Sequence, residues 1–276
     1  QRAPRRGPDL LVHHLASASG HTMVRHVPSR RAPVRSVPVG VQPARRGLPG
    51  AAGLPRAARR PLLAIAGGPG ARVAELGAGT GALALPLARA GARVHAVEPA
   101  RAMLDALADD DGAGAVVPVH AAAEETGLPG GAFDLVVLAD ALQWVDPALA
   151  GREAARLLAP GGALAVVTPR LADTSFLRAL GARISAANFK ARSGPPPVAL
   201  LFAEAGLAAP EEERYHDEVL LPPERLDAVL RSLSYVGPAI GPDALAALLA
   251  DARALAKAHG GAVWRREIAL DWSRRS

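Results

Sequence analysis

The pattern of hydrophobic and polar positions changes near residue 60. From residue 61 onward, short apolar runs alternate with stretches of helical periodicity. Apolar runs of this length between turn residues are typical of buried parallel strands. The alternation predicts an α/β fold whose parallel sheet has right-handed crossover connections. The predicted strands are 72–76, 93–97, 115–119, 133–138 and 163–168, and the helices between them are 81–90, 101–108 and 147–158.

After residue 168 the pattern is less regular, and mixed polarity replaces the continuous apolar runs. An edge strand is predicted over 213–221 because its two faces differ little in polarity. A final strand is predicted over 263–272, with Val263, Arg265, Glu267, Ala269 and Asp271 on one face. The predicted helices of this part are 175–187, 198–205, 223–233 and 242–259.

Residues 1–60 form a basic leader of different composition. They contain 12 Arg and one acidic residue, Asp9, whereas 61–276 carries more acidic than basic residues. Prolines recur through the leader, and proline disfavours both helix interiors and central strands. We therefore expect 1–60 to be disordered or irregular, and 61–276 to form the folded domain.

Composition excludes several classes of function. The chain has 276 residues, of which 50% are hydrophobic and 21% charged, so it can bury a sizeable core. It has no Cys, which excludes disulfide scaffolds, thiolate zinc sites and a cysteine nucleophile. The histidines show no spacing typical of a metal site. No apolar run is long enough to cross a membrane, and no clear signal peptide is present, so we expect a soluble, cytoplasmic protein.

The strongest motif is Glu75-Leu76-Gly77-Ala78-Gly79-Thr80-Gly81, which follows a predicted strand and opens a predicted helix. Glycines allow a sharp turn and a close approach of backbone to ligand. Glu98 ends the next predicted strand, where a carboxylate can accept hydrogen bonds from both hydroxyls of a ribose. The motif alone fits a dinucleotide site, a methyl-donor site or a plain tight turn.

Together with further blocks in the same order, this motif resembles the class I S-adenosylmethionine-dependent methyltransferases. The resemblance covers residues 61–170. A weaker similarity is to the small-molecule branch that includes trans-aconitate methyltransferase-like proteins. It rests on residues 230–236 and on Gln143-Trp144-Val145-Asp146. In the second of these segments, Gln143 stands where that branch has a His. The further blocks are Ala122–Pro129, Phe133–Val137 and the Pro160-Gly161-Gly162 turn within Leu157–Leu164.

The resemblance implies a Rossmann-like sheet of seven strands, parallel except for one, with helices on both faces and S-adenosylmethionine as cofactor. It implies that the segments 171–260 cover the substrate. By the same resemblance, Glu75 anchors the amino group of the donor, Glu98 binds its ribose, and Asp140 faces its methionine portion. The remaining implied donor contacts are Gly77, Ala78, Gly79 and Gly81 on the methionine side and Ala123 and Glu124 along the adenine.

Few residues are candidates for direct catalysis. His216 and Tyr215 lie in the C-terminal part, where this family builds its substrate covers. Gln143 stands where the branch has a His, and Trp144 can lie against a substrate or a cationic donor, or simply pack in the core. A carboxylate acceptor would need no base, whereas a hydroxyl or a carbon acid would need one.

Four functions remain open, in this order. The first is transfer of a methyl group from S-adenosylmethionine to a small-molecule carboxylate, hydroxyl or carbon by in-line displacement. The second is a nucleic-acid-associated methyltransferase guided by the basic leader, against which the acidic domain and the scarcity of aromatics weigh. The third is a protein that binds the donor with weak or no turnover, because the leader lacks the aromatic residues of a lid. The fourth is a nicotinamide-dependent enzyme, against which the glycine spacing weighs.

Overall fold

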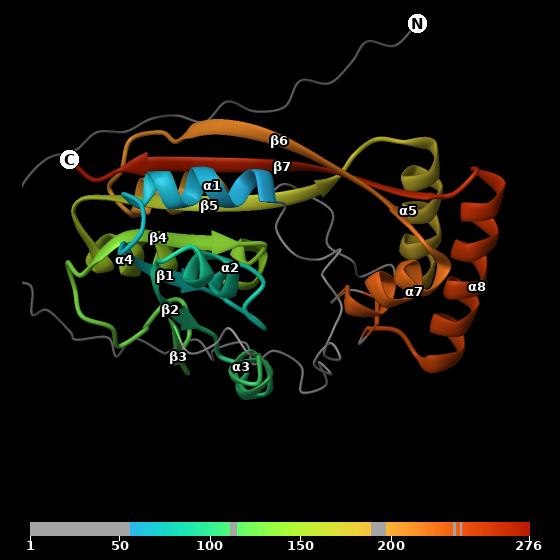
Figure 1. Cartoon of the computed structure of the whole chain (residues 1–276), viewed down its shortest axis with the longest axis horizontal. Helices are drawn as coiled ribbons and strands as arrows, with labels where there is room; N and C mark the ends of the chain where they lie inside the picture. Colours follow the sequence, from blue (N-terminus) through green and yellow to red (C-terminus); the bar gives the residue numbers. More distant parts are fainter. Residues whose placement is uncertain (1–55, 111–114, 189–196, 234–235, 238) are drawn as a thin grey trace, which may run out of the picture. The chain divides into compact units, whose positions relative to one another are not determined.

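The computed structural model describes residues 56–110, 115–188, 197–233, 236–237 and 239–276 (Figure 1). Contacts divide the chain into two units, residues 1–36 and residues 37–276. Everything described below lies in the second unit.

A seven-stranded sheet runs through this unit in the order β3-β2-β1-β4-β5-β7-β6. Neighbours from β3 to β5 are parallel, β7 is antiparallel to both β5 and β6, and β7 is thus the one reversed strand. The order reverses at the junction of β1 and β4, which is where open α/β sheets bind ligands beyond the carboxyl ends of their strands. The strands are β1 (Arg72–Leu76), β2 (Arg93–Val97), β3 (Val116–Val119), β4 (Phe133–Ala139), β5 (Leu158–Leu171), β6 (Glu211–Leu221) and β7 (Ala262–Arg274).

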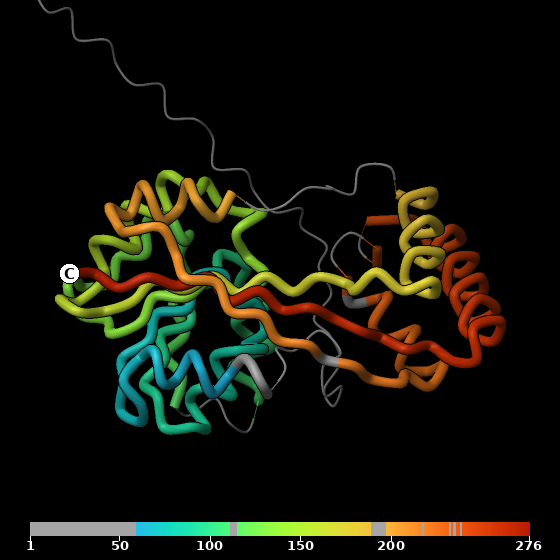
Figure 2. Tube along the Cα trace, turned by 90° about the horizontal axis from the view of Figure 1, so that it is seen from above, coloured from blue at the N-terminus to red at the C-terminus, as the bar shows by residue number. Residues whose placement is uncertain are grey.

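Helices cover both faces of the sheet, so alternate residues of each central strand enter different cores (Figure 2). On one face, α1 (Arg56–Ile65) and α2 (Ala84–Arg89) pack on Val73 of β1 and Leu135 of β4, with Leu107 of α3 (Arg101–Ala108). Because both neighbouring residues of a strand are buried, the central strands are apolar at nearly every position.

The opposite face carries α4 (Pro147–Leu157) and α6 (Val198–Glu204), which pack on Ala74, Leu138 and Val166. The start of α4 is fixed locally. The Asp146 side chain accepts hydrogen bonds from the N–H groups of Ala148 and Leu149, at 2.9 and 3.1 Å, which satisfies two donors of the first helical turn.

A third cluster of buried side chains forms around α5 (Ser175–Ala187), α7 (Pro223–Ser232) and α8 (Pro242–Ala258). It also includes Leu221 at the end of β6 and Trp264 near the start of β7. Strands β5, β6 and β7 extend past β1 to β4, and their extensions carry these helices (Figure 1). The C-terminal segments thus build a separate core at the carboxyl end of β5.

The predicted fold class is confirmed, including the single reversed strand and the edge position of β6. The predicted faces of β7 are also observed, because Trp264, Ile268 and Leu270 are buried while Arg265 is exposed. Several boundaries differ from the prediction, and the largest difference is that β5 begins at Leu158 rather than Ala163. Helix α2 begins at Ala84 rather than Gly81, β5 extends to Leu171, and β6 begins at Glu211.

Helix α1 begins at Arg56, inside the segment predicted to be irregular. It places Leu62 and Ile65 in the core beside β1, so the amphipathic pattern of this stretch outweighs its proline. Pro61 lies inside the helix. The rest of the leader, residues 1–55, lies outside the described residues.

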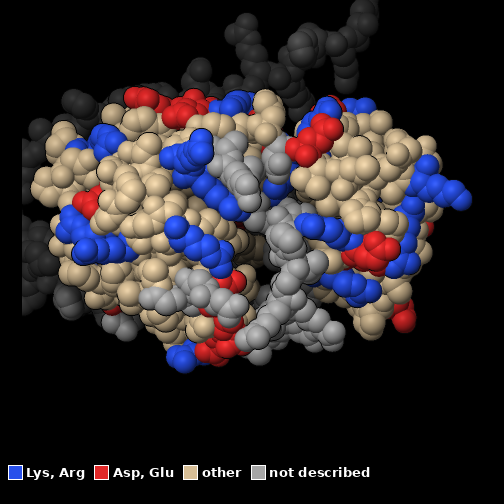
Figure 3. Space-filling model, in the orientation of Figure 1, with Lys and Arg blue, Asp and Glu red and all other residues tan. Residues whose placement is uncertain are grey.

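One face of the molecule carries mixed charge. On the face shown in Figure 3, Lys and Arg side chains are interspersed with Asp and Glu and separated by other residues. Among the helices in the described ranges, none is long and apolar enough to span a lipid bilayer.

Candidate functional site

The glycine motif forms a turn between β1 and α2, at the junction where the strand order reverses. Gly77, Gly79 and Gly81 all have positive φ, of 77°, 57° and 84°. The N–H groups of Gly77 and Ala78 both donate to the carbonyl oxygen of Val97, at 2.9 Å each. The turn is thereby held against the carboxyl end of β2.

Gly77 is required for space as well as for its φ. A Cβ built at this position would lie 2.7 Å from the Cβ of Ala141, well inside van der Waals contact. Ala141 belongs to the loop after β4, so the absence of a side chain at Gly77 lets the ends of β1 and β4 meet.

Glu98 closes the turn from the β2 side. Its Oε2 accepts a hydrogen bond of 3.0 Å from the N–H of Gly79, and its Oε1 accepts one of 2.9 Å from the N–H of Ala100. The side chain is buried. Each carboxylate oxygen can accept a second hydrogen bond, so Glu98 can hold the turn and still bind a hydroxyl pair.

Glu75 is the unusual group of the site. It is 2% exposed, and its Oε2 has no hydrogen-bond partner. Burial raises the pKa of this carboxyl to about 8, against the opposing effect of a hydrogen bond from the Ala84 backbone, and the charge of Glu98 raises it further. A buried carboxylate with an unsatisfied oxygen favours a cation or a strong donor beside it.

Asp140 follows β4 and lies in the left-handed region, with φ 52°. Its N–H donates to the carbonyl oxygen of Val167 at 2.9 Å. The Gln143 side chain donates to the carbonyl oxygen of Asp140 at 2.9 Å and to its Oδ1 at 3.2 Å. Although Asp140 is solvent-accessible, desolvation by the surrounding protein raises the pKa of its carboxyl, partly offset by the Gln143 bond.

The segment after β3 lies against the loop that precedes α4. Ala123 is buried, and the Glu124 side chain accepts a hydrogen bond of 2.8 Å from the N–H of Asp146. Trp144, in the short helix η2 (Leu142–Trp144), is 60% exposed, which excludes the alternative that it packs in the core.

Sequence reasoning missed the residue that anchors this segment. Glu153 of α4 is buried, and its Oε1 accepts hydrogen bonds from Thr126, at 2.9 Å from the backbone N and 2.6 Å from Oγ1. Arg156 donates to both oxygens of the same carboxylate at 2.7 Å. Burial opposes ionisation of Glu153, but these bonds win and lower its pKa to about 2. The sequence signal that could have found this contact is a glutamate on the core face of a predicted helix, because a buried carboxylate needs hydrogen-bond partners.

Two catalytic candidates lie away from the turn. Tyr215 and His216 belong to β6, which β5 and β7 separate from β4. Three strand spacings put them about 14 Å from β4 across the sheet. The Tyr215 hydroxyl donates to Glu213, and burial together with this bond raises its pKa to about 12. The structure places Asp140 next to the turn with Gln143 bonded to it, Trp144 follows in the same loop, and Tyr215 and His216 lie apart from the turn.

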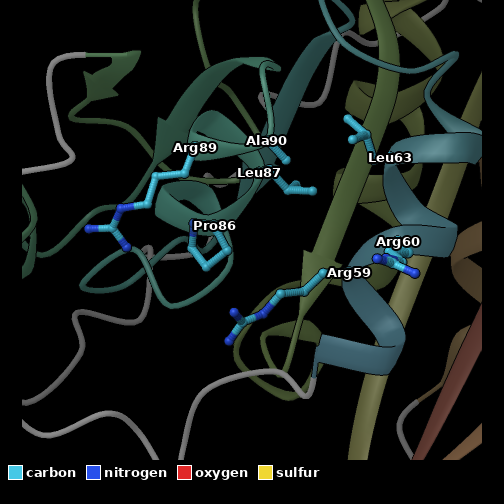
Figure 4. A pocket seen from close by; sticks show the side chains of 7 residues that line it. All are labelled: Arg59, Arg60, Leu63, Pro86, Leu87, Arg89 and Ala90. Carbon is cyan, nitrogen blue, oxygen red and sulfur yellow. The ribbon is translucent and has the colours of Figure 1, made fainter.

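A cavity of about 400 Å³ lies elsewhere, between α1 and the C-terminal half of α2 (Figure 4). Since α2 runs back from the carboxyl ends of the strands, this end of it faces away from the glycine turn. The cavity therefore adds no residue to the site. It is lined by Arg59, Arg60, Leu63, Pro86, Leu87, Arg89 and Ala90.

Comparison with known proteins decides between the possible ligands of the turn. Residues 74–166 match the family model described as "Methyltransferase domain". An uncharacterized methyltransferase of Mycobacterium bovis and one of Mycobacterium tuberculosis are each 45% identical over 100 residues, which is 35% of this chain and 39% of theirs. The comparisons support a class I S-adenosylmethionine-dependent methyltransferase domain at residues 74–166.

Solved structures extend the likeness beyond the matched domain. A protein of Anaeromyxobacter dehalogenans, provisionally described as a type II methyltransferase, aligns with a TM-score of 0.57 at 26% identity, covering 81% of this chain and 96% of that one. The YcgJ protein of Bacillus subtilis aligns with a TM-score of 0.55 at 17% identity, covering 80% and 99%. The methyltransferase fold thus includes the C-terminal strands, whereas the matched region spans only two fifths of the mycobacterial relatives, 39%. The trans-aconitate branch stays a prediction.

The residues present fit the cofactor of this family. S-adenosylmethionine carries an ammonium group and a ribose with two hydroxyls. The unsatisfied Oε2 of Glu75 suits the ammonium group, and the remaining lone pairs of Glu98 suit the hydroxyls. The glycine turn between them leaves backbone exposed to a ligand without an intervening Cβ.

Proposed function

We propose that this chain is an enzyme that transfers a methyl group from S-adenosylmethionine to a small-molecule acceptor by in-line displacement. The observation that carries the proposal is the pairing of Glu75 and Glu98 around one glycine turn, at the point where the strand order reverses. When bound, the cofactor supplies a methyl group already activated on a positively charged sulfur.

In this proposal the chain's residues bind and orient the donor. Glu75 holds the amino group, Glu98 binds the ribose, and Asp140 borders the methionine portion. Alignment of the reacting atoms can supply roughly 7–11 kcal/mol of rate enhancement, so positioning is the main task of the protein. The other proposed contacts are Gly77, Ala78, Gly79 and Gly81 with the methionine portion and Ala123 and Glu124 with the adenine.

The loop contacts support the assignment of the adenine side. Glu153 and Arg156 fasten Thr126 to α4, and Glu124 is bonded to the N–H of Asp146. These contacts fix the loop that contains Ala123 without using any group of the glycine turn. A segment fixed in this way can border a flat ring without first having to be ordered.

A small-molecule acceptor is favoured over a nucleic acid. The face shown in Figure 3 has mixed charge, and 61–276 carries more acidic than basic residues. Nucleic-acid binding draws mostly on clustered basic side chains. Deletion of the basic leader tests the alternative, since a large loss of RNA or DNA affinity would support it.

The donor site is tested by isothermal titration with S-adenosylhomocysteine. Gly79→Arg should abolish binding because its side chain would fill the turn, where a Cβ has only the Met103 sulfur at 3.9 Å. Gly206→Arg is the matched control, since Gly206 has a similar φ of 67° and open space around it at the end of α6. Equal affinity of both variants and the wild type would refute the proposed site.

A further inference from the structure

The loop after β4 lies directly beside the glycine turn. The close approach of Ala141 to Gly77 joins them, and Asp140 immediately precedes Ala141. The N–H of Asp140 bonds to the carbonyl oxygen of Val167 near the end of β5, so the residue is fixed to that neighbouring strand. A carboxylate therefore lies at the carboxyl end of β4, next to the place proposed for the donor.

The backbone of Asp140 is strained. Among the residues that the structure describes, it is the one non-glycine residue with positive φ. Such a conformation costs about 1–3 kcal/mol and persists where the surroundings hold it, most often at functional sites. Here the bond to Val167 and the Gln143 bond to the Asp140 carbonyl oxygen hold it.

Gln143 also holds the side chain. Its amide nitrogen donates to Oδ1 of Asp140, which fixes the carboxyl relative to the loop. An amide donor favours the ionised, accepting form of a carboxyl, whereas the local desolvation favours the protonated form. Desolvation is the larger of the two effects and raises the pKa of this carboxyl, so it takes up a proton more readily than an ordinary aspartate.

The strand order places Asp140 on the reacting side of the donor. Strand β1 lies between β2 and β4, so Glu98 and Asp140 flank the turn from opposite sides. A donor with its ribose at Glu98 therefore extends toward β4. The exposed ring of Trp144 lies four residues beyond Asp140 and offers an apolar surface for the body of an acceptor.

We propose that Asp140, positioned by Gln143, accepts the proton of the attacking group, and that the acceptor is accordingly a hydroxyl or an amine rather than a carboxylate. This inference rests on the proposed function and adds a catalytic role to the donor contact already assigned to Asp140.

The step balances without any further reactant. A lone pair on the acceptor oxygen or nitrogen forms the bond to the methyl carbon. The carbon–sulfur bond breaks and leaves its electron pair on sulfur. The proton of the acceptor passes to the Asp140 carboxylate and is later released to water.

The charges explain why proton transfer is needed at this position. A carboxylate that stayed ionised beside the positively charged sulfur would stabilise the ground state, in which that charge is present, more than the transition state, in which it is being lost. A carboxylate that takes up a proton during attack loses its charge as the sulfur does. An acceptor carboxylate has no such proton to give and is repelled by Asp140.

The test measures the pKa of Asp140 by carbon NMR in protein saturated with S-adenosylhomocysteine and then with S-adenosylmethionine. The two ligands differ by one methyl group and one positive charge at the sulfur. An opposite charge within ~4–6 Å lowers a carboxyl pKa by about 1–3 units, so we expect a lower value with S-adenosylmethionine. An Asp140→Asn spectrum assigns the signal, and Asp251 in α8 serves as the distant control.

An Asp140 pKa that is the same with both ligands would overturn the inference, because the carboxyl would then not face the reacting atoms. Failure of S-adenosylhomocysteine to bind would instead remove the proposed function and this inference together. In Gln143→Leu, the loss of the amide bond should raise the Asp140 pKa. An unchanged pKa would show that Gln143 does not position Asp140.

The acceptor class is tested by transfer of labelled methyl groups to a panel of carboxylic acids, phenols, alcohols and amines. We expect label only in products that resist mild alkali, and about a 100-fold or greater loss of rate in Asp140→Asn. Label released by alkali as methanol comes from methyl esters and would overturn the assignment of a hydroxyl or amine.

Discussion

Glu98 Oε2 accepts a hydrogen bond of 3.0 Å from the backbone N–H of Gly79, and this single bond ties the end of β2 to the middle of the glycine turn. The other oxygen of the same carboxylate is bonded to the N–H of Ala100, at the start of α3. Glu98 therefore has a structural task in addition to the ribose contact proposed for it. A change at this residue should affect stability and donor affinity together.

Glu98→Gln should destabilise the fold and weaken the binding of S-adenosylhomocysteine. The amide keeps one acceptor but turns an NH₂ group toward one of the two backbone N–H donors, which leaves a buried donor unsatisfied. The expected loss is about 1–3 kcal/mol in the free energy of unfolding. Urea denaturation and isothermal titration measure the two effects.

The matched control for this variant is Glu224→Gln, which removes the same charge from an exposed position in the first turn of α7. Its free energy of unfolding should change by less than about 0.5 kcal/mol. If Glu98→Gln were as stable as this control, the two backbone bonds would contribute nothing measurable to the turn.

Glu75 should make the free protein less stable as the pH rises. Its pKa is about 8 in the folded chain and 4.5 as the ordinary value, so the folded state holds more protons between these values. The free energy of unfolding then falls with increasing pH across pH 4.5–8, by up to roughly 1.4 kcal/mol per pH unit. Urea denaturation at pH 5.5 and pH 8 measures this difference.

Glu75→Gln is the test of that assignment, since the amide cannot ionise. Its stability should match the wild type near pH 4, where Glu75 is largely protonated in both states, and exceed it at pH 8, in the absence of donor. If the free energy of unfolding of Glu75→Gln depended on pH as that of the wild type does, another group would be the one that titrates in this range.

The same carboxyl should couple donor binding to proton release. At pH 7 Glu75 is largely protonated in the free protein, and an ammonium group beside its unsatisfied Oε2 would favour the ionised form. Binding of S-adenosylhomocysteine should therefore release close to one proton. Titrations in buffers of different ionisation enthalpy measure this number, which should be near zero in Glu75→Gln.

The strands and their order were accessible from the sequence because the central strands are buried on both faces. Val73 and Ala74 enter different cores, so β1 is apolar from Val73 to Leu76 with one conspicuous exception, Glu75. The glycines that follow mark the turn, and Glu98 marks the end of the next strand. Local patterns were sufficient at these positions because the constraints themselves are local.

The remaining features depend on contacts between distant segments. The clamp of Thr126 by Glu153 joins residues that are 27 apart in sequence, and no pattern at either position specifies the other. The left-handed Asp140 depends on β5 and Gln143. His216 lies far from the turn because β6 is at the edge of the sheet. The mixed polarity of β6 indicates an edge strand, but it does not tell how many strands separate β6 from β4.

Glu153→Gln should loosen the loop that precedes β4. The amide retains an acceptor for Thr126 but loses its charge-assisted bonds with Arg156, for an expected cost of about 1.5–3 kcal/mol. Because the pKa of Glu153 is lowered to about 2, its stabilising effect is present above pH 4.5 and lost as the pH falls toward 2. Urea denaturation at pH 7 and pH 3 should show a smaller difference between variant and wild type at pH 3.

Asp251→Asn is the control for a charge pair on the surface. Asp251 and Arg183 are 3.0 Å apart and both more than half exposed, at 53% and 56%, so this pair should contribute less than about 1 kcal/mol. Equal losses in the two variants would contradict the importance assigned to the buried Glu153. Donor affinity should fall in Glu153→Gln alone.

Gly77→Ala should destabilise the chain more than the same change at Gly131. Both glycines have positive φ, at 77° and 64°, so each substitution carries the left-handed cost of about 1–2 kcal/mol. A Cβ at Gly131 meets nothing within 4 Å, whereas a Cβ at Gly77 meets Ala141 at 2.7 Å. Only Gly77→Ala should therefore push the ends of β1 and β4 apart.

In the double variant with Ala141→Gly the clash is removed, so the two changes should couple favourably by about 0.5–3 kcal/mol. Additive losses in that cycle, measured by urea denaturation, would mean that β1 and β4 do not meet at this contact.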